Sequence, residues 1–155
     1  MSVATTHLTS PAPWAAEPPR LARQLGYAGL IPFGLGAVLA WLVYPEAQPL
    51  VLRAVAAYGV CIVAFLGGLH WGLAMRAGHN EPAHFVWAVV PPLVASVAAL
   101  MPENAGLVLI GVMLLVCYAV DRKLLAEQGL GAWLTLRFRL SALGSFCCFL
   151  AAASA

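Results

Sequence analysis

The side chains that could carry chemistry in this sequence are few, and they lie within strongly apolar runs. His70 and Trp71 belong to the stretch Phe65–Gly72, which reads F-L-G-G-L-H-W-G. Tyr118 and Asp121 lie near the end of another apolar run. Titratable and hydrogen-bonding groups are costly in such surroundings, so each one is a candidate for proton transfer, ligand binding or a structural hydrogen bond.

His70 allows three chemical interpretations. Its imidazole can donate a structural hydrogen bond to a backbone carbonyl, it can relay protons or bind a ligand near neutral pH, or it can ligate haem. A lone histidine would need a second axial ligand from another subunit to hold haem, so this third interpretation has the least support. The sequence leaves the structural and the proton-relay interpretations open.

Other polar side chains fall at a depth similar to that of His70 in the apolar runs. Asp121 is followed directly by Arg122, and we interpret this pair as an ion pair at a membrane interface rather than as a transport carboxylate. The predicted polar layer consists of His70, Trp71, Tyr118, Asp121, Arg122 and Arg137.

No catalytic, metal or cofactor site is predicted. The loop His79–His84 contains two histidines and one glutamate, but their spacing fits no standard metal site. Paired carboxylates, a nucleotide-binding loop and an H-E-x-x-H motif are all missing from the sequence. The cysteines form no C-x-x-C pair, and we interpret them as small apolar fillers: Cys61, Cys117, Cys147 and Cys148.

The composition indicates an integral membrane protein. Of the 155 residues, 63% are hydrophobic and 9% are charged, whereas soluble domains carry about 25% charged residues. The apolar runs are continuous rather than alternating, which favours helices over barrel strands. The net charge of +2 is too small to suggest nucleic acid as a partner. The predicted fold class is therefore an all-α bundle in the lipid bilayer.

Five apolar segments are long enough, or nearly so, to cross a bilayer of about 30 Å. They cover residues 26–44, 50–75, 85–101, 105–125 and 133–153. The third is short and contains two prolines, so four spans with one re-entrant segment are an alternative. Residues 1–22 are predicted to be a flexible proline-rich tail without the features of a signal peptide, and residues 23–155 to be one transmembrane domain.

The basic residues predict the orientation of these spans. Five spans place nearly all of them on one side, which the positive-inside rule assigns to the cytoplasm. We therefore expect a cytoplasmic amino terminus and a carboxyl terminus outside, in the inner membrane of a bacterium. The predicted cytoplasmic side holds Arg20, Arg23, Arg76, Arg122, Lys123, Arg137 and Arg139, and the other side holds Arg53.

Glycines and prolines predict how the helices pack. Small residues at steps of three and four let helices approach closely in lipid, and two such stripes follow the second span. One stripe is Ala56, Gly59, Val63, Gly67, His70 and Ala74, and the other is Ala57, Cys61, Ala64, Gly68 and Gly72. We expect both stripes to contact neighbouring helices.

Prolines are predicted to break the first and third spans. Pro32, Pro91 and Pro92 free the carbonyls of the residues four positions earlier, which need other donors. We expect His70 to donate to one of the two carbonyls freed in the third span, those of Trp87 and Ala88.

Several motifs resemble an uncharacterised proteobacterial membrane family that is similar to mitochondrial transmembrane-protein-69-like proteins. The motifs are Tyr27–Phe33, Phe65–Gly72, Asp121–Lys123, Trp133 and Arg137. The resemblance covers residues 24–150 and implies a multi-helix inner-membrane protein without an established activity.

Two functions remain open. The leading hypothesis is a non-enzymatic assembly, scaffold or accessory subunit, with the lipid bilayer and another membrane protein or a second copy as partners. The alternative is a small proton-coupled transporter or channel that uses a polar layer of His70 and Asp121.

Overall fold

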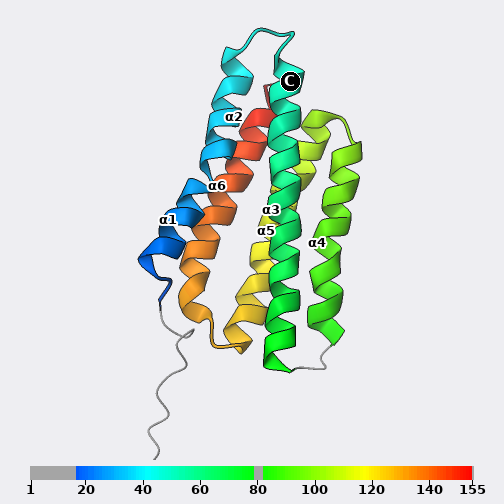
Figure 1. Cartoon of the computed structure of the whole chain (residues 1–155). Coiled ribbons are helices and arrows are strands. Elements are labelled where there is room, and N and C mark those ends of the chain that lie inside the picture. The colour runs from blue at the N-terminus through cyan, green and yellow to red at the C-terminus, as the bar shows by residue number, and fades with distance from the viewer. Residues whose placement is uncertain (1–16, 79–81, 155) are drawn as a thin grey trace, which may run out of the picture.

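The chain folds into a bundle of helices that run roughly along one axis (Figure 1). A computed structural model describes residues 17–78 and 82–154, and it confirms the all-α prediction. In chain order the helices are α1 (Arg20–Ala28), α2 (Ile31–Leu42), α3 (Gln48–Ala77), α4 (Pro82–Leu100), α5 (Glu103–Glu127), the short 3₁₀ helix η2 (Gly131–Trp133) and α6 (Leu134–Ala152).

Five helical segments have the length and composition needed to cross a membrane, as predicted. They are Arg20–Leu42, Gln48–Arg76, Pro82–Leu100, Glu103–Glu127 and Gly131–Ala152. The first combines α1 with α2, and the last combines η2 with α6. The third segment is one continuous helix of 19 residues, which is the length of a span rather than that of a re-entrant hairpin.

The first span is longer than predicted and is broken. It begins at Arg20, so the predicted tail of residues 1–22 is too long by its last residues; residues 1–16 of that tail lie outside the described residues. The break falls at Gly29 and Leu30, because Pro32 occupies the first turn of α2 and has no N–H to continue α1. The Tyr58 hydroxyl donates to the Gly29 carbonyl at 2.8 Å. This hydrogen bond provides a donor for one carbonyl within the break.

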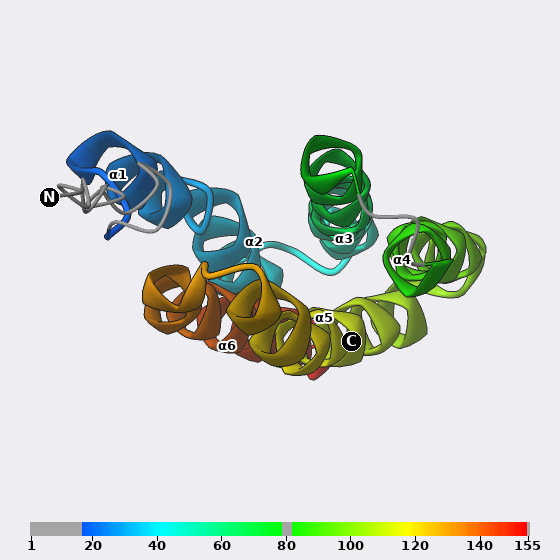
Figure 2. The same cartoon turned by 90° about the horizontal axis from the view of Figure 1, so that it is seen from below.

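Helix α3 contacts four other helices. Seen along the axis, the other helices form an arc from α1 to α4, and α3 lies on its inner side (Figure 2). It packs most extensively on α4 and also contacts α2, α5 and α6. The contacts between α5 and α6 are almost as extensive.

One predicted stripe of α3 supplies these contacts. All six of its residues, from Ala56 to Ala74, are buried. At Gly67, a Cβ would lie 2.6 Å from the Ala88 carbonyl oxygen and 2.9 Å from Cδ of Pro92, so the backbones of α3 and α4 touch there. Gly59 is similarly tight, since a Cβ would lie 2.7 Å from Cγ2 of Ile110 on α5.

The second stripe faces away from the bundle, so the packing prediction is wrong for Gly68 and Gly72. Both glycines are exposed, and apart from the adjacent residues and the nearby backbone of α3 itself, no atom of the described residues lies within 4 Å of a Cβ built at either one. The physical reason is the 100° turn per residue of an α-helix. Gly67 already points at α4, so its neighbour Gly68 points outward.

Pro91 and Pro92 do not break α4, contrary to the prediction. The helix continues through both residues. Pro91 is buried, and the carbonyl of Ala88, which Pro92 deprives of its helical donor, lies against Gly67 of α3. A neighbouring helix without a side chain at this point accommodates the irregular backbone.

Candidate polar site

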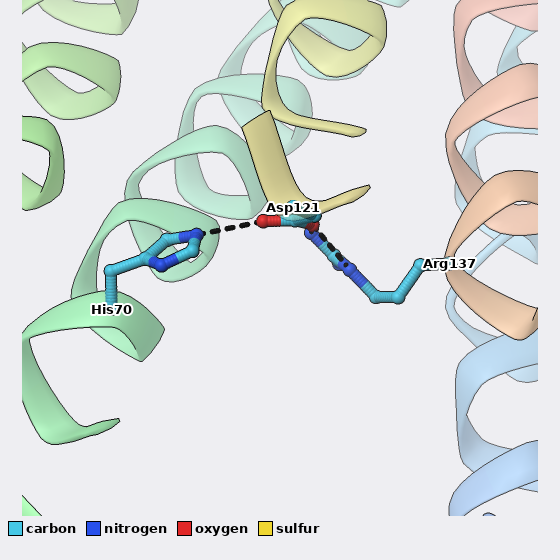
Figure 3. A network of polar contacts seen from close by, with 3 residues as sticks. All are labelled: His70, Asp121 and Arg137. Carbon is cyan, nitrogen blue, oxygen red and sulfur yellow. Dashed lines mark hydrogen bonds and ion pairs between the residues drawn. The ribbon is translucent and has the colours of Figure 1, made fainter. Parts of the chain in front are cut away.

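A buried carboxylate joins three helices near one end of the bundle. Asp121 on α5 is completely buried. Nε2 of His70 on α3 lies 2.7 Å from its Oδ1. Arg137 on α6 donates from Nε to Oδ2 at 2.7 Å, and one of its terminal nitrogens donates to the same oxygen. Figure 3 shows the carboxylate between the imidazole and the guanidinium. We call these three residues the polar triad.

The local sequence explains why each side chain points inward. Asp121 follows Ile110, Leu114 and Cys117 at steps of three and four, and all of these residues are buried. His70 lies on the inward stripe of α3, three residues after Gly67. Arg137 lies in the first turns of α6, four residues before the buried Ser141. The triad is therefore built from the inward faces of three helices.

The charges of Asp121 and Arg137 compensate each other. Charge-assisted hydrogen bonds of this kind are about twice as strong as neutral ones. An ionised carboxylate can only accept, so Nε2 of His70 carries the hydrogen in this contact. With a neutral imidazole, the triad as a whole has no net charge.

The second nitrogen of His70 is not satisfied in the same way. Nδ1 is buried, and no described residue forms a hydrogen bond with it. In the neutral imidazole this atom is an acceptor, and protonation would make it a donor and give the triad a positive charge. The site thus holds one buried nitrogen that the ion pair does not use.

The structure brings together three of the six residues in the predicted polar layer. Trp71 instead packs edge-on against Phe85, with ring centroids 5.4 Å apart. Tyr118 packs against Phe138, with centroids 5.2 Å apart. Arg122 is exposed on the outer face of α5.

Two predicted pairings are wrong. His70 contacts Asp121 rather than the carbonyls of Trp87 and Ala88, because the inward face of α3 at this level meets α5. Asp121 pairs with Arg137 rather than with Arg122. Adjacent residues of a helix point about 100° apart, so Arg122 cannot share the inward direction of Asp121.

A cavity next to the triad was not predicted. Arg137 lines a pocket of about 550 Å³ whose wall also contains residues of α1, α2, α3 and α5. The sequence carries no direct signal for this pocket, because its residues come from five α-helices and η2, and their grouping depends on how α1 is placed.

No metal site is found in the described part of the chain. No group of three or more His, Cys, Asp or Glu side chains lies close enough to hold an ion there. Of the histidine loop, residues 79–81 lie outside the described residues, and His84 is buried at the start of α4.

A comparison with known families identifies the chain. Residues 18–153 match the profile of a family described as a protein of unknown function, DUF3429. The chain belongs to this family. Every member of the polar triad lies within the matched range, as do all five spans of the DUF3429 chain.

The DUF3429 chain is also similar to a curated protein. It is 41% identical over 93 residues to Transmembrane protein 69 of Xenopus tropicalis. The alignment covers 57% of this chain and 36% of that protein, so the chain spans about a third of the relative's length. This similarity and the family match confirm the resemblance to transmembrane-protein-69-like proteins. No solved structure has significant similarity to the chain.

Proposed function

We propose that this multi-pass membrane protein is a non-enzymatic accessory or assembly subunit of a bacterial cytoplasmic membrane. The observation that carries the proposal is the position of the polar triad at one end of a mainly apolar core. Between the triad and the opposite end, buried apolar side chains fill the bundle; they include Phe33, Ala37, Leu52, Val55, Val63, Ala95, Leu107 and Ile110.

This arrangement supports a rigid scaffold more than a conduction path. A path for ions or protons is lined by polar groups or water. Among the described residues, the buried polar side chains beyond the triad are His84, Ser141 and Ser145. The Ser145 hydroxyl is occupied, because it donates to the Gly111 carbonyl at 2.7 Å. In this proposal the hydrogen bonds of the triad hold α3, α5 and α6 in fixed positions relative to one another.

The proposed orientation places the triad on the cytoplasmic side, with the carboxyl terminus outside. The basic residues support it, because seven of eight lie at the triad end of the spans. The eighth, Arg53, lies near the start of α3 and donates to Glu103 at 2.7 Å at the opposite end.

Partner capture combined with reconstitution tests the proposal. The chain with an affinity tag should co-purify with a defined membrane protein or a second copy in fixed stoichiometry after mild detergent extraction. The purified chain in liposomes that contain a pH-sensitive dye should leave proton flux unchanged. A proton flux that depends on the protein and disappears in His70→Gln would overturn the proposal.

A small proton-coupled transporter or channel is the second candidate, and one observation favours it. Nδ1 of His70 is buried and has no partner among the described residues, while Nε2 of the same ring contacts an ionised carboxylate. An imidazole held in this way can take up a proton and return it. The flux assay above distinguishes the two candidates directly.

A further inference from the structure

Three buried nitrogen atoms on α3 and α4 have no hydrogen-bond partner among the described residues. They are Nδ1 of His70 on α3 and, on α4, Nδ1 of His84 and Nε1 of Trp87. The two histidines are 1% and 5% exposed, so their rings are shielded from the surroundings of the bundle. Buried polar groups in proteins almost always have a partner, either in the chain or in an ordered water. These nitrogens therefore point to a bound molecule that satisfies them.

The packing of α3 on α4 places the two histidines at one level of the bundle. The backbone of Gly67 lies against the Ala88 carbonyl, and the two helices run in opposite directions past this contact. His70 follows Gly67 by three residues, about 4.5 Å along α3, and His84 precedes Ala88 by four residues, about 6 Å along α4. Both displacements lead toward the same end of the bundle. The two imidazoles therefore lie on facing helices at nearly the same height.

A ring contact between the neighbours of the histidines supports this level. Trp71 follows His70, Phe85 follows His84, and the rings of Trp71 and Phe85 pack edge-on with centroids 5.4 Å apart. Trp87 lies three residues after His84 and is therefore its neighbour on one side of α4. The three nitrogens without a partner thus belong to one layer between α3 and α4.

The chemistry of these nitrogens matches a water molecule. Nε2 of His70 donates to Asp121, so Nδ1 of the neutral ring is an acceptor. The indole of Trp87 can only donate, and Nδ1 of His84 accepts or donates according to its tautomer. A water can accept from the indole and donate to both imidazoles, and about three hydrogen bonds are typical of a buried water. A metal ion fits less well, because the indole N–H is no ligand and the described residues contain no metal-binding group.

We propose that α3 and α4 enclose a bound water molecule that joins Nδ1 of His70 to Nδ1 of His84 and accepts from Nε1 of Trp87. Through Asp121 and Arg137, which face His70 from α5 and α6, this water extends the polar triad to a fourth helix. It also connects His70 to the first turn of α4, at the end of the bundle where α3 ends. The inference holds for either candidate function, because it concerns how the buried imidazoles are satisfied.

Solid-state nuclear magnetic resonance of the full chain in lipid bilayers, with ¹⁵N-labelled histidine, tests this site. An ordered water should transfer magnetisation to the rings of His70 and His84, and Nδ1 of His70 should have the chemical shift of a hydrogen-bonded acceptor. Spectra of His70→Gln and His84→Gln assign the signals. The shift of a free nitrogen at Nδ1 of His70 would overturn the proposal. A hydrogen-bonded shift without transfer from water would also overturn it, since the two rings would then contact each other directly.

A matched pair of tryptophan substitutions locates the water. Trp87→Phe removes the indole N–H and should shift the Nδ1 signal of His70 several-fold more than Trp133→Phe does. Trp133 also has a buried indole nitrogen without a partner among the described residues, but it lies on η2, which packs on α5 and α6. Equal shifts in the two variants would refute the site.

Substitutions of His84 test its role as a positioning residue for His70. His84→Phe should remove the transfer from water to His70 and shift its Nδ1 signal, while His84→Gln should keep both, because an amide still donates and accepts. A role in packing alone would change the melting temperature and leave the Nδ1 signal unmoved, which would contradict the proposal. Circular dichroism melting confirms that each variant is folded. If His84→Phe does not fold, the wild-type spectrum and the tryptophan pair decide the question.

Discussion

Nε2 of His70 lies 2.7 Å from Oδ1 of Asp121, although 51 positions separate the two residues along the chain. The contact joins α3 to α5, and the same carboxylate joins α5 to α6 through Arg137. A single buried charge thus fixes the relative rotation of three helices. Removal of the Asp121 charge should therefore destabilise the whole bundle rather than one helix.

Replacement of Asp121 by Asn should destabilise the protein strongly. It would leave the Arg137 guanidinium without its counter-charge, and breaking a buried ion pair costs about 3–5 kcal/mol. We expect a loss of stability near the lower end of this range. The reason is that the Arg137 side chain is 12% exposed and can reach polar surroundings. Thermal melting in detergent measures the effect.

A double-mutant cycle provides the control for this pair. Asp121→Asn combined with Arg137→Gln should be less destabilising than the sum of the single changes, because the second substitution removes the uncompensated charge. Strict additivity would contradict the proposed coupling between the two residues.

His70→Ala should destabilise the chain by about 1–3 kcal/mol, because it removes one donor from a buried carboxylate. His70→Gln should recover part of this loss, since its amide still donates. Melting temperatures of the three proteins in one detergent check the order wild type, Gln, Ala. If Gln and Ala melted together, the hydrogen bond to Asp121 would not be the stabilising feature of His70.

The two adjacent glycines of α3 should respond in opposite ways to the same substitution. Gly67→Leu should cost at least about 1–3 kcal/mol by overpacking against the backbone of α4. Gly68→Leu should change the free energy of unfolding by less than about 0.5 kcal/mol, as is usual for an exposed position. Similar melting temperatures for the two variants would mean that α3 does not direct Gly67 towards α4 and Gly68 away from it.

A reporter fused after the carboxyl terminus should be active only outside the cytoplasm. Five spans and the uneven distribution of the basic residues predict this orientation. A paired fusion in the loop before α6 should give the opposite signal. A cytoplasmic carboxyl terminus would mean that one of the five segments does not cross.

The spans and the inward face of α3 could be predicted because each depends on local sequence. Hydrophobic length determines the spans, and the helical repeat places Gly59, Gly67 and His70 on one face. These features require no knowledge of neighbouring helices. For the same reason the similar level of His70 and Asp121 along the bundle could be inferred from their positions in the apolar runs.

Side-chain pairing depends on quantities that a single sequence does not contain. The choice of Arg137 rather than Arg122 as the partner of Asp121 follows from the rotation of α5 about its axis and from the position of α6 beside it. The orientation of Gly68 follows in the same way from the contact of Gly67 with α4. The pocket depends on the break at Gly29, whose direction Pro32 alone does not determine.

The joint between α1 and α2 has a consequence for the energetics of local opening. None of the nine residues of α1 is buried, and the break at Gly29 interrupts the helical hydrogen bonds that would tie it to α2. Because stability within a protein varies with the apolar contacts of each segment, α1 can detach at little cost while the other helices stay folded. Its backbone amides should therefore exchange with deuterium well before those of α3 and α5, as an independent unit at the edge of the bundle.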